Sequence, residues 1–106
     1  MDKDLQYVKL FGVYGNLLTE HQKDLFNLYY ECDLSLGEIA EINGISRQSV
    51  NDALKKSREI LLDIESKLGF LDKFSKINDI LSTAKNSDDE VALQLADDIS
   101  RVLEDI

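Results

Sequence analysis

The sequence predicts an all-α protein of about six helices, and two observations lead to this fold class. Residues that interrupt helices are rare, because proline is absent and only five glycines occur among the 106 residues. Apolar residues recur at spacings of three and four, the period of an amphipathic helix. A chain of this length suits a single hydrophobic core, and no disulfide or cofactor is needed to hold it together.

Helix N-termini are marked by three short segments. TEHQ, SLGE and SDDE, which begin at Thr19, Ser35 and Ser87, each fit the capping box, where a hydroxyl accepts a hydrogen bond from the third amide and the third side chain bonds back. Together with the apolar spacing, these segments predict six helices: Leu5–Leu17, Glu20–Cys32, Leu36–Asn43, Arg47–Leu68, Leu71–Ala84 and Asp88–Glu104.

The first two predicted helices each carry an apolar face, which we assign to the core rather than to base stacking. The two faces consist of Tyr7, Phe11 and Tyr14, and of Leu25, Leu28, Tyr29 and Cys32. On this interpretation the single cysteine is a small buried apolar group.

Residues 35–57, SLGEIAEINGISRQSVNDALKKS, contain the parts of a helix-turn-helix. Ala40 is small enough for close helix approach, and Gly44 supplies a turn that admits positive φ. Ile45 fills the corner, and Ser46 can cap the next helix. That helix carries an apolar seam at spacings of four and three: Val50, Leu54, Ser57, Leu61, Ile64 and Leu68.

The side of this helix opposite the seam has the chemistry of a DNA-reading surface. Arg can fork onto guanine, Gln and Asn can pair with adenine edges, and Lys neutralises phosphates. The candidates for base reading are Arg47, Gln48 and Asn51, and those for backbone contact are Ser46, Lys55, Lys56 and Arg58. The alternative interpretation is a polar helix face that is merely solvated.

Charge is distributed unevenly along the chain. The formal net charge is -9, yet residues 46–58 hold four bases and one acid, a local charge of +3. Residues 70–106 hold four bases and nine acids, a balance of -5. With only about four phosphate contacts, one monomer would bind DNA weakly. Dimerisation or a recruiting partner is therefore implied if DNA is the target.

The chain is predicted to divide near Gly69, in the segment KLGF, which offers a left-handed end to the fourth helix. Residues 1–70 would form the helix-turn-helix domain, and residues 71–106 an acidic helical extension. Each helix of the extension has an apolar stripe that must be buried, either on the amino-terminal helices or on a second copy in a homodimer. The stripes consist of Phe74, Ile77, Leu81 and Ala84, and of Val91, Leu95, Ile99, Val102 and Ile106.

The remaining residues suggest no catalytic or metal site. His21 is the only histidine, and GVYG, residues 12–15, lacks the strand and the Lys-Ser/Thr of a phosphate loop. No nucleophile, base and orienting group can be assembled, so the sequence predicts a protein that is not an enzyme and needs no cofactor or metal. The acidic N-terminal segment and the lack of a long apolar run predict a cytoplasmic protein without a membrane span.

Residues 17–50, LLTEHQKDLFNLYYECDLSLGEIAEINGISRQSV, resemble the DNA-reading region four of bacterial sigma factors. With the flanks YVKLFGVYGN and NDALKKSREILLDIESKLGF, the chain resembles the YlxM-like family of small Gram-positive proteins over about residues 5 to 70. The resemblance implies a regulatory role and a link to the signal recognition particle pathway, which is inferred for the family from its gene neighbourhood.

Two functions are consistent with these features. In the first, the protein is a DNA-binding regulator that uses Arg47–Arg58 as its groove helix. In the second, it is an interaction module that keeps the helix-turn-helix fold and contacts protein or ribonucleoprotein partners of the signal recognition particle pathway. The local positive charge favours the first function, and the acidic chain as a whole favours the second.

Overall fold

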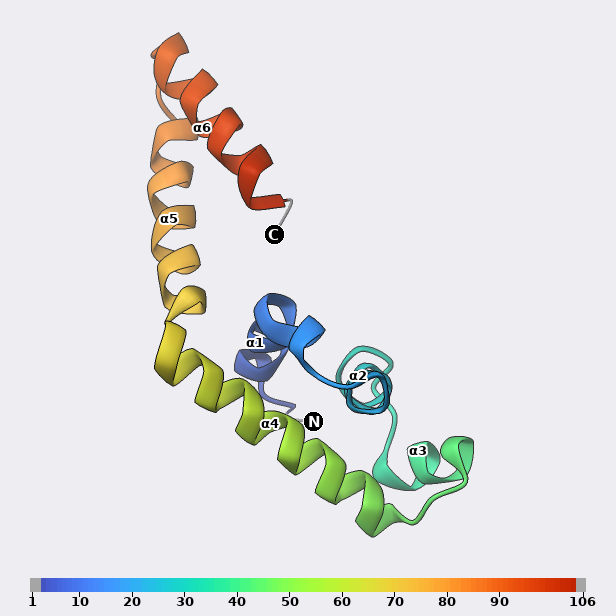
Figure 1. Ribbon diagram of the computed structural model, residues 1–106. Coiled ribbons are helices and arrows are strands. Elements are labelled where there is room, and N and C mark those ends of the chain that lie inside the picture. Colours follow the sequence, from blue (N-terminus) through green and yellow to red (C-terminus); the bar gives the residue numbers. More distant parts are fainter. Residues whose placement is uncertain (1–2, 105–106) are drawn as a thin grey trace. The chain divides into compact units, whose positions relative to one another are not determined.

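The computed structural model describes residues 3–104, and every regular element within them is helical (Figure 1). This confirms the all-α fold class. The chain forms two compact units, Met1–Leu68 and Gly69–Ile106. The helices are α1 (Leu5–Tyr14), α2 (Glu20–Phe26), α3 (Leu36–Asn43) and α4 (Arg47–Leu68) in the first unit, and α5 (Phe70–Lys85) and α6 (Glu90–Glu104) in the second. None of the helices in residues 3–104 is long and apolar enough to cross a bilayer.

The long helix α4 is the element against which α1, α2 and α3 pack, and Figure 1 shows all three on one side of it. Four positions of the predicted seam are buried: Val50, Leu54, Ser57 and Leu61. The buried Ser57 hydroxyl donates to the Ala53 carbonyl at 2.9 Å, so burial leaves no polar group unpaired there. The prediction was wrong for Leu68, which is 46% exposed, because the last turn of α4 extends past the side chains that cover the seam.

A π-helical turn, Asn27–Glu31, replaces the α-helical continuation that was predicted for the second helix. Its signature is the hydrogen bond from the Cys32 amide to the Asn27 carbonyl, five residues earlier, at 3.0 Å. The extra residue in this turn rotates the following backbone, so Cys32 is exposed and the prediction of a buried cysteine was wrong. The first helix likewise ends in a 3₁₀ turn, Gly15–Leu17, rather than in α-helix.

Aromatic rings join α1 to the segment that follows α2. The ring centroids of Phe11 and Phe26 lie 4.5 Å apart, and those of Phe26 and Tyr30 lie 4.3 Å apart, both in stacked geometry. Phe26 is buried in the core, whereas Tyr30 is half-buried. These side chains therefore pack the first unit, in agreement with the assignment of the aromatic residues to the core.

Two of the three predicted capping boxes are confirmed, those that begin at Thr19 and Ser35. In the second box, hydrogen bonds with Ser35 hold the pKa of the Glu38 carboxyl below its usual range. The third prediction was wrong, because Asp89 caps α6 by accepting from the Val91 amide at 2.9 Å. Ser87 instead accepts from the Asp89 amide. A carboxylate is favoured at a helix N-terminus by the helix dipole, so α6 begins two residues later than predicted.

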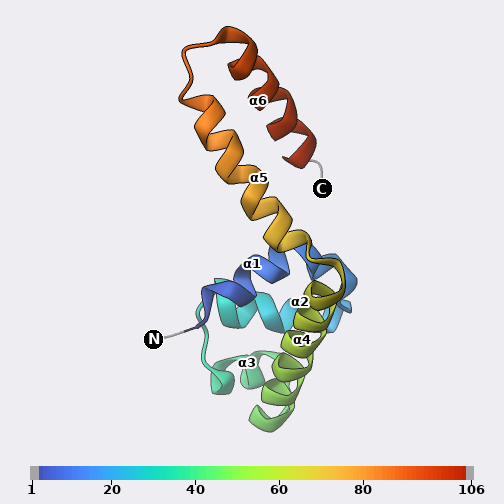
Figure 2. The ribbon, with the colours of Figure 1, turned by 90° about the vertical axis from the view of Figure 1, so that its left-hand side faces the viewer.

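The second unit is an antiparallel hairpin of α5 and α6 (Figure 2). On α5 the predicted stripe faces inward, with Leu81 buried and the other members half-buried. On α6 the buried residue is Ala96, and the predicted stripe is exposed instead: Val91 66%, Leu95 56%, Ile99 45% and Val102 67%. The fifth stripe position, Ile106, lies outside the described residues.

Candidate nucleic-acid interface

The turn between α3 and α4 has the geometry that the sequence predicts. Gly44 adopts φ 64° and ψ 34°, a left-handed conformation that ends α3. Its amide donates to the Glu41 carbonyl, and the Ile45 amide donates to the Ala40 carbonyl at 3.1 Å. These bonds satisfy carbonyls at the C-terminal end of α3. The chain can therefore reverse within three residues and begin α4 at Arg47.

Ser46 caps α4, as predicted. Its Oγ accepts from the Ser49 amide at 3.0 Å and lies 2.9 Å from the Ser49 Oγ. This bond satisfies one of the free amides at the helix N-terminus. The Ser46 hydroxyl is thus already engaged with the helix that it begins.

The polar side of α4 opposite the seam is exposed. The predicted base readers Arg47, Gln48 and Asn51 and the predicted phosphate contacts Lys55 and Lys56 all lie on exposed positions. The aliphatic part of Arg47 lies beside α3, since a Cβ added to Gly37 would be 3.9 Å from the Arg47 Cδ. We refer to these five exposed side chains as the groove face.

One acid lies among the bases of the groove face. Asp52 Oδ1 accepts from the Gln48 Nε2 at 2.8 Å, one helical turn apart. This bond fixes which way the Gln48 amide points. It also puts a negative charge beside the residues that would contact phosphates.

Arg58, the seventh predicted site residue, has a different environment from the groove face. It is half-buried, its Nη1 donates to the Tyr30 hydroxyl at 3.3 Å, and its guanidinium lies 5.8 Å from the centre of the Tyr7 ring. Burial raises the pKa of the Tyr30 hydroxyl, and the hydrogen bond from Arg58 opposes that shift. Arg58 therefore joins α4 to the aromatic side chains of the core.

Lys3 is a residue that sequence reasoning missed. Its Nζ donates to the carbonyls of Tyr29 and Leu34, lies 3.2 Å from the Asp33 carboxylate and sits 3.8 Å above the Tyr29 ring. Lys3 thereby holds the segment that leads into α3, where Asp33 has a positive φ of 55°. No local pattern pairs Lys3 with carbonyls 26 and 31 residues away, so spacing alone could not have found it.

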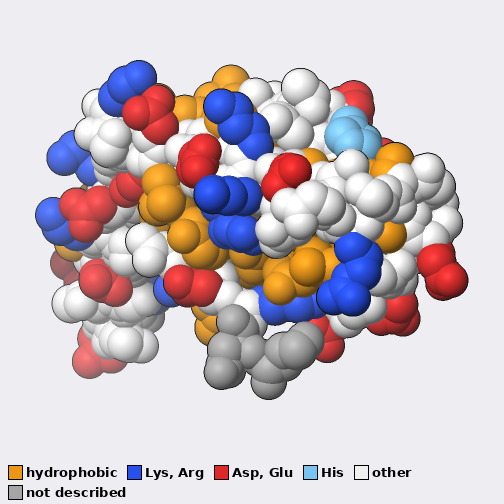
Figure 3. All heavy atoms as spheres, turned by 90° about the horizontal axis from the view of Figure 1, so that it is seen from below, with side chains coloured by type: hydrophobic (Ala, Val, Ile, Leu, Met, Phe, Trp, Pro, Cys, Tyr) orange, Lys and Arg blue, Asp and Glu red, His pale blue; other side chains and the backbone are white. Residues whose placement is uncertain are grey.

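The surface around these elements carries both signs of charge. Figure 3 shows basic side chains singly or in small groups, with acidic and apolar side chains between them. In the part of the chain that the structure describes, no three His, Cys, Asp or Glu side chains gather as metal ligands would. The candidate site therefore consists of the groove face and the turn that orients it.

A helix that ends in a left-handed glycine, followed by a capped helix with a buried seam and an exposed polar side, defines a helix-turn-helix protein. Comparison of the sequence agrees with this class. The model of the UPF0122 family, described as "Putative helix-turn-helix protein, YlxM / p13 like", matches residues 1–100. The chain belongs to this family, as its resemblance to YlxM-like proteins predicted.

Curated relatives match over most of their length. A UPF0122 protein of Halalkalibacterium halodurans is 45% identical over 92 residues, which cover 87% of this chain and 84% of the relative. One from Clostridium acetobutylicum is 35% identical, with 95% and 94% of the two chains covered. One from a Thermoanaerobacter species is 36% identical, with 100% and 98% covered. The family description names a putative helix-turn-helix.

The left-handed conformation of Gly44 predicts how substitutions there change stability. Gly44→Ala should lower the free energy of unfolding by about 1 kcal/mol, because a Cβ disfavours positive φ although no atom lies within 4 Å of it. Gly12→Ala is the matched control: Gly12 is exposed within α1, so the same change should raise stability by up to about 1 kcal/mol. Urea denaturation measures both. Equal effects of the two variants would contradict the turn.

The contacts of Arg58 predict that this side chain contributes to stability. Arg58→Ala should lower the free energy of unfolding by about 1 kcal/mol, because it removes a hydrogen bond and a cation–π contact from the aromatic cluster. Lys55→Ala, on the groove face of the same helix, should change stability by less than about 0.5 kcal/mol. Thermal denaturation followed by circular dichroism compares them. If Arg58→Ala leaves the free energy of unfolding unchanged, the contacts of Arg58 do not contribute to the stability of the fold.

Proposed function

We propose that the protein is a DNA-binding regulator that inserts the N-terminal half of α4 into the major groove of double-stranded DNA. The observation that carries this proposal is the exposed groove face, which lies opposite the buried seam and follows the left-handed turn at Gly44. An α-helix fits the major groove, and a helix-turn-helix presents its second helix in this way. Membership of a family described by that motif supports the same function.

The residues of the groove face have distinct roles in this proposal. Arg47, in the first turn of α4, reads guanine, and Gln48 and Asn51 read adenine edges. Lys55 and Lys56, further along the helix, neutralise phosphates. Of the other two predicted contacts, Ser46 mainly caps α4 and Arg58 mainly braces it, so we assign them a smaller part in backbone contact.

Asp52 limits the affinity of this surface. Its carboxylate repels nearby phosphates, and it holds the Gln48 amide at 2.8 Å. The local charge of +3 on residues 46–58 is also small against the net charge of -9. A single copy should therefore bind weakly and lose affinity steeply as salt increases.

We further propose that this regulation concerns the signal recognition particle pathway, as the resemblance to the YlxM-like family implies. Within the same pathway, an interaction module that contacts protein or ribonucleoprotein without binding DNA is the second candidate. The observation that favours the second candidate is the mixture of acidic and basic side chains on the surface, since a duplex prefers a continuous basic face (Figure 3).

Titration of labelled duplexes, selected from a random pool, tests the first function. Lys55→Ala should weaken binding to all duplexes alike and reduce the salt slope by about one, because one phosphate contact is lost. Arg47→Ala should cost about 1 to 3 kcal/mol on the preferred sequence and much less on others. Asp52→Asn should strengthen binding to every duplex, because it removes a negative charge from the groove face.

A matched control removes one charge elsewhere. Lys9 is exposed on α1, and Lys9→Ala should leave the binding of all duplexes nearly unchanged. If the parent protein binds no duplex even at low salt, or if Arg47→Ala and the parent bind every sequence equally, the groove-reading role is wrong. Binding to pathway components without binding to DNA would then select the interaction module.

A further inference from the structure

The second unit buries very little of its own apolar surface. Among the residues of this unit that the structure describes, the regular elements are the two helices of the hairpin, and the buried residues are Leu81 and Ala96. Units of about this size rarely fold alone without a disulfide, a metal or another chain to cover them. The hairpin therefore needs a further apolar surface against it.

Five of the exposed apolar residues of the hairpin lie on one of its faces, whereas Leu93, 38% exposed, lies on another side of α6. Leu95 directly precedes the buried Ala96 on α6, and the exposed Ile80 directly precedes the buried Leu81 on α5. One residue turns a helix by about 100°. Each exposed residue is therefore rotated by about 100° from the buried residue that faces the other helix. Because α5 and α6 are antiparallel and face each other, these two rotations bring Ile80 and Leu95 to the same side of the hairpin. We call this the side face: Ile80, Val91, Leu95, Ile99 and Val102, which are 45% to 68% exposed.

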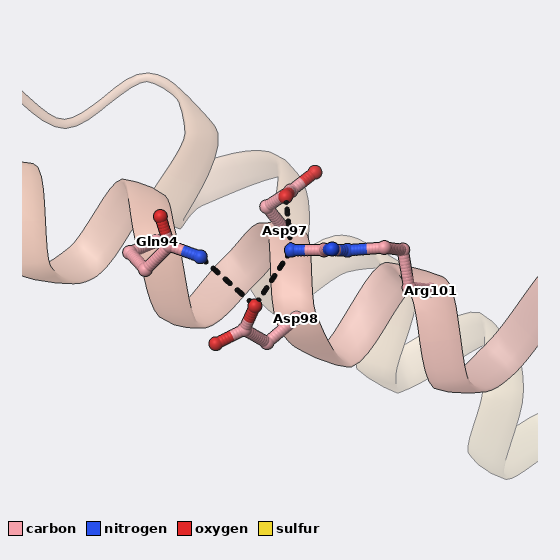
Figure 4. A network of polar contacts seen from close by, with 4 residues as sticks. All are labelled: Gln94, Asp97, Asp98 and Arg101. Carbon is pink, nitrogen blue, oxygen red and sulfur yellow. Dashed lines mark hydrogen bonds and ion pairs between the residues drawn. The ribbon is translucent and has the colours of Figure 1, made fainter.

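The polar residues of α6 lie away from this face. Arg101 pairs with Asp97 and Asp98 at 2.8 Å each, and Gln94 Nε2 donates to Asp98 at 2.9 Å (Figure 4). These four exposed side chains form one connected network on the solvent side of the helix. Helix α6 therefore has apolar side chains on one side that its contact with α5 leaves exposed.

We propose that the side face binds the side face of a second copy of the chain, so that two hairpins form a four-helix bundle. Along α6 this face is aliphatic, and α5 adds Ile80. A two-fold axis places the same face of both copies together, as an isologous contact requires. The bundle would also deepen the burial of the hairpin's half-buried residues, including Phe74 and Ile77. This contact would form whether or not the protein binds DNA.

The area of the side face suits this occupant. A hairpin of one 16-residue and one 15-residue helix is about 24 Å long and about 20 Å wide, or roughly 480 Å² per copy in projection. Two such faces bury on the order of 1,000 Å² together, the lower bound of a specific interface. A single partner helix would cover only about half of this area.

The net charges of α5 and α6 favour one arrangement of the two hairpins. Helix α5 holds three lysines and two aspartates, a charge of +1, and α6 holds one arginine and four acids, a charge of -3. A two-fold axis parallel to the helices sets α5 of one copy against α6 of the other, whereas a perpendicular axis in the interface sets like helices together. Opposite charges favour the parallel axis. Ile80 then lies level with Leu95 of the second copy, and both chains enter the bundle at the same end.

Sedimentation equilibrium of the full chain tests the contact. The parent protein should have about twice the 12.0 kDa mass of one chain at micromolar concentration. Leu95→Glu should raise the dimer dissociation constant at least about a hundredfold, because it buries a carboxylate in the interface. Gln94→Glu adds the same charge on the solvent side and should leave the mass unchanged. A monomeric parent, or a Leu95→Glu protein that remains dimeric, would overturn the proposal.

Disulfide trapping tests the arrangement. Because Cys32 is an exposed thiol, the variants are made on a Cys32→Ser background. A mixture of Ile80→Cys and Leu95→Cys proteins should form disulfide-linked dimers on mild oxidation, since these positions are level across the interface. Leu95→Cys alone should form far fewer, because the two copies of α6 lie diagonally. Equal yields, or no linked dimer in the mixture, would rule out the parallel two-fold axis.

Discussion

The buried seam of α4 is the constraint on which the first unit depends. Val50, Leu54, Ser57 and Leu61 face the three helices that pack on one side of α4. Once this side is buried, the orientation of every other residue on α4 is determined by the helical repeat. The groove face is exposed for that reason, and a shift of α4 by one residue would turn it by about 100° toward the core.

The same seam explains why the unit can present a polar surface without losing stability. The side chains that contact the core and those offered to a ligand are separate sets, joined only at residues such as Arg58. The left-handed turn at Gly44 and the cap at Ser46 fix the start of α4, so the helix does not need a ligand to become ordered. A surface that is ordered in advance loses less entropy on binding, which partly offsets its modest charge.

Local interactions could be predicted from the sequence, and long-range ones could not. The capping boxes at Thr19 and Ser35 and the turn at Gly44 depend on residues within five positions of one another, and all three were predicted correctly. Ser87 and Asp89 are both competent caps, and spacing cannot rank them. The carbonyls that Lys3 contacts are 26 and 31 residues away in the sequence. Which side of α6 is exposed depends on which of its apolar residues contact α5. Only the tertiary fold supplies that information.

The π-helical turn at Asn27–Glu31 has the form of a single residue inserted into an α-helix. Deleting one residue there would restore regular α-helical hydrogen bonds and so improve the helix locally. The deletion would also rotate Tyr30 out of its stack with Phe26 and shift the Tyr29 carbonyl away from Lys3. The number of residues in this segment is therefore constrained more strictly than their identity. Many substitutions can preserve the turn. A relative with a one-residue gap here in an alignment would have a different backbone in the segment that leads into its helix-turn-helix.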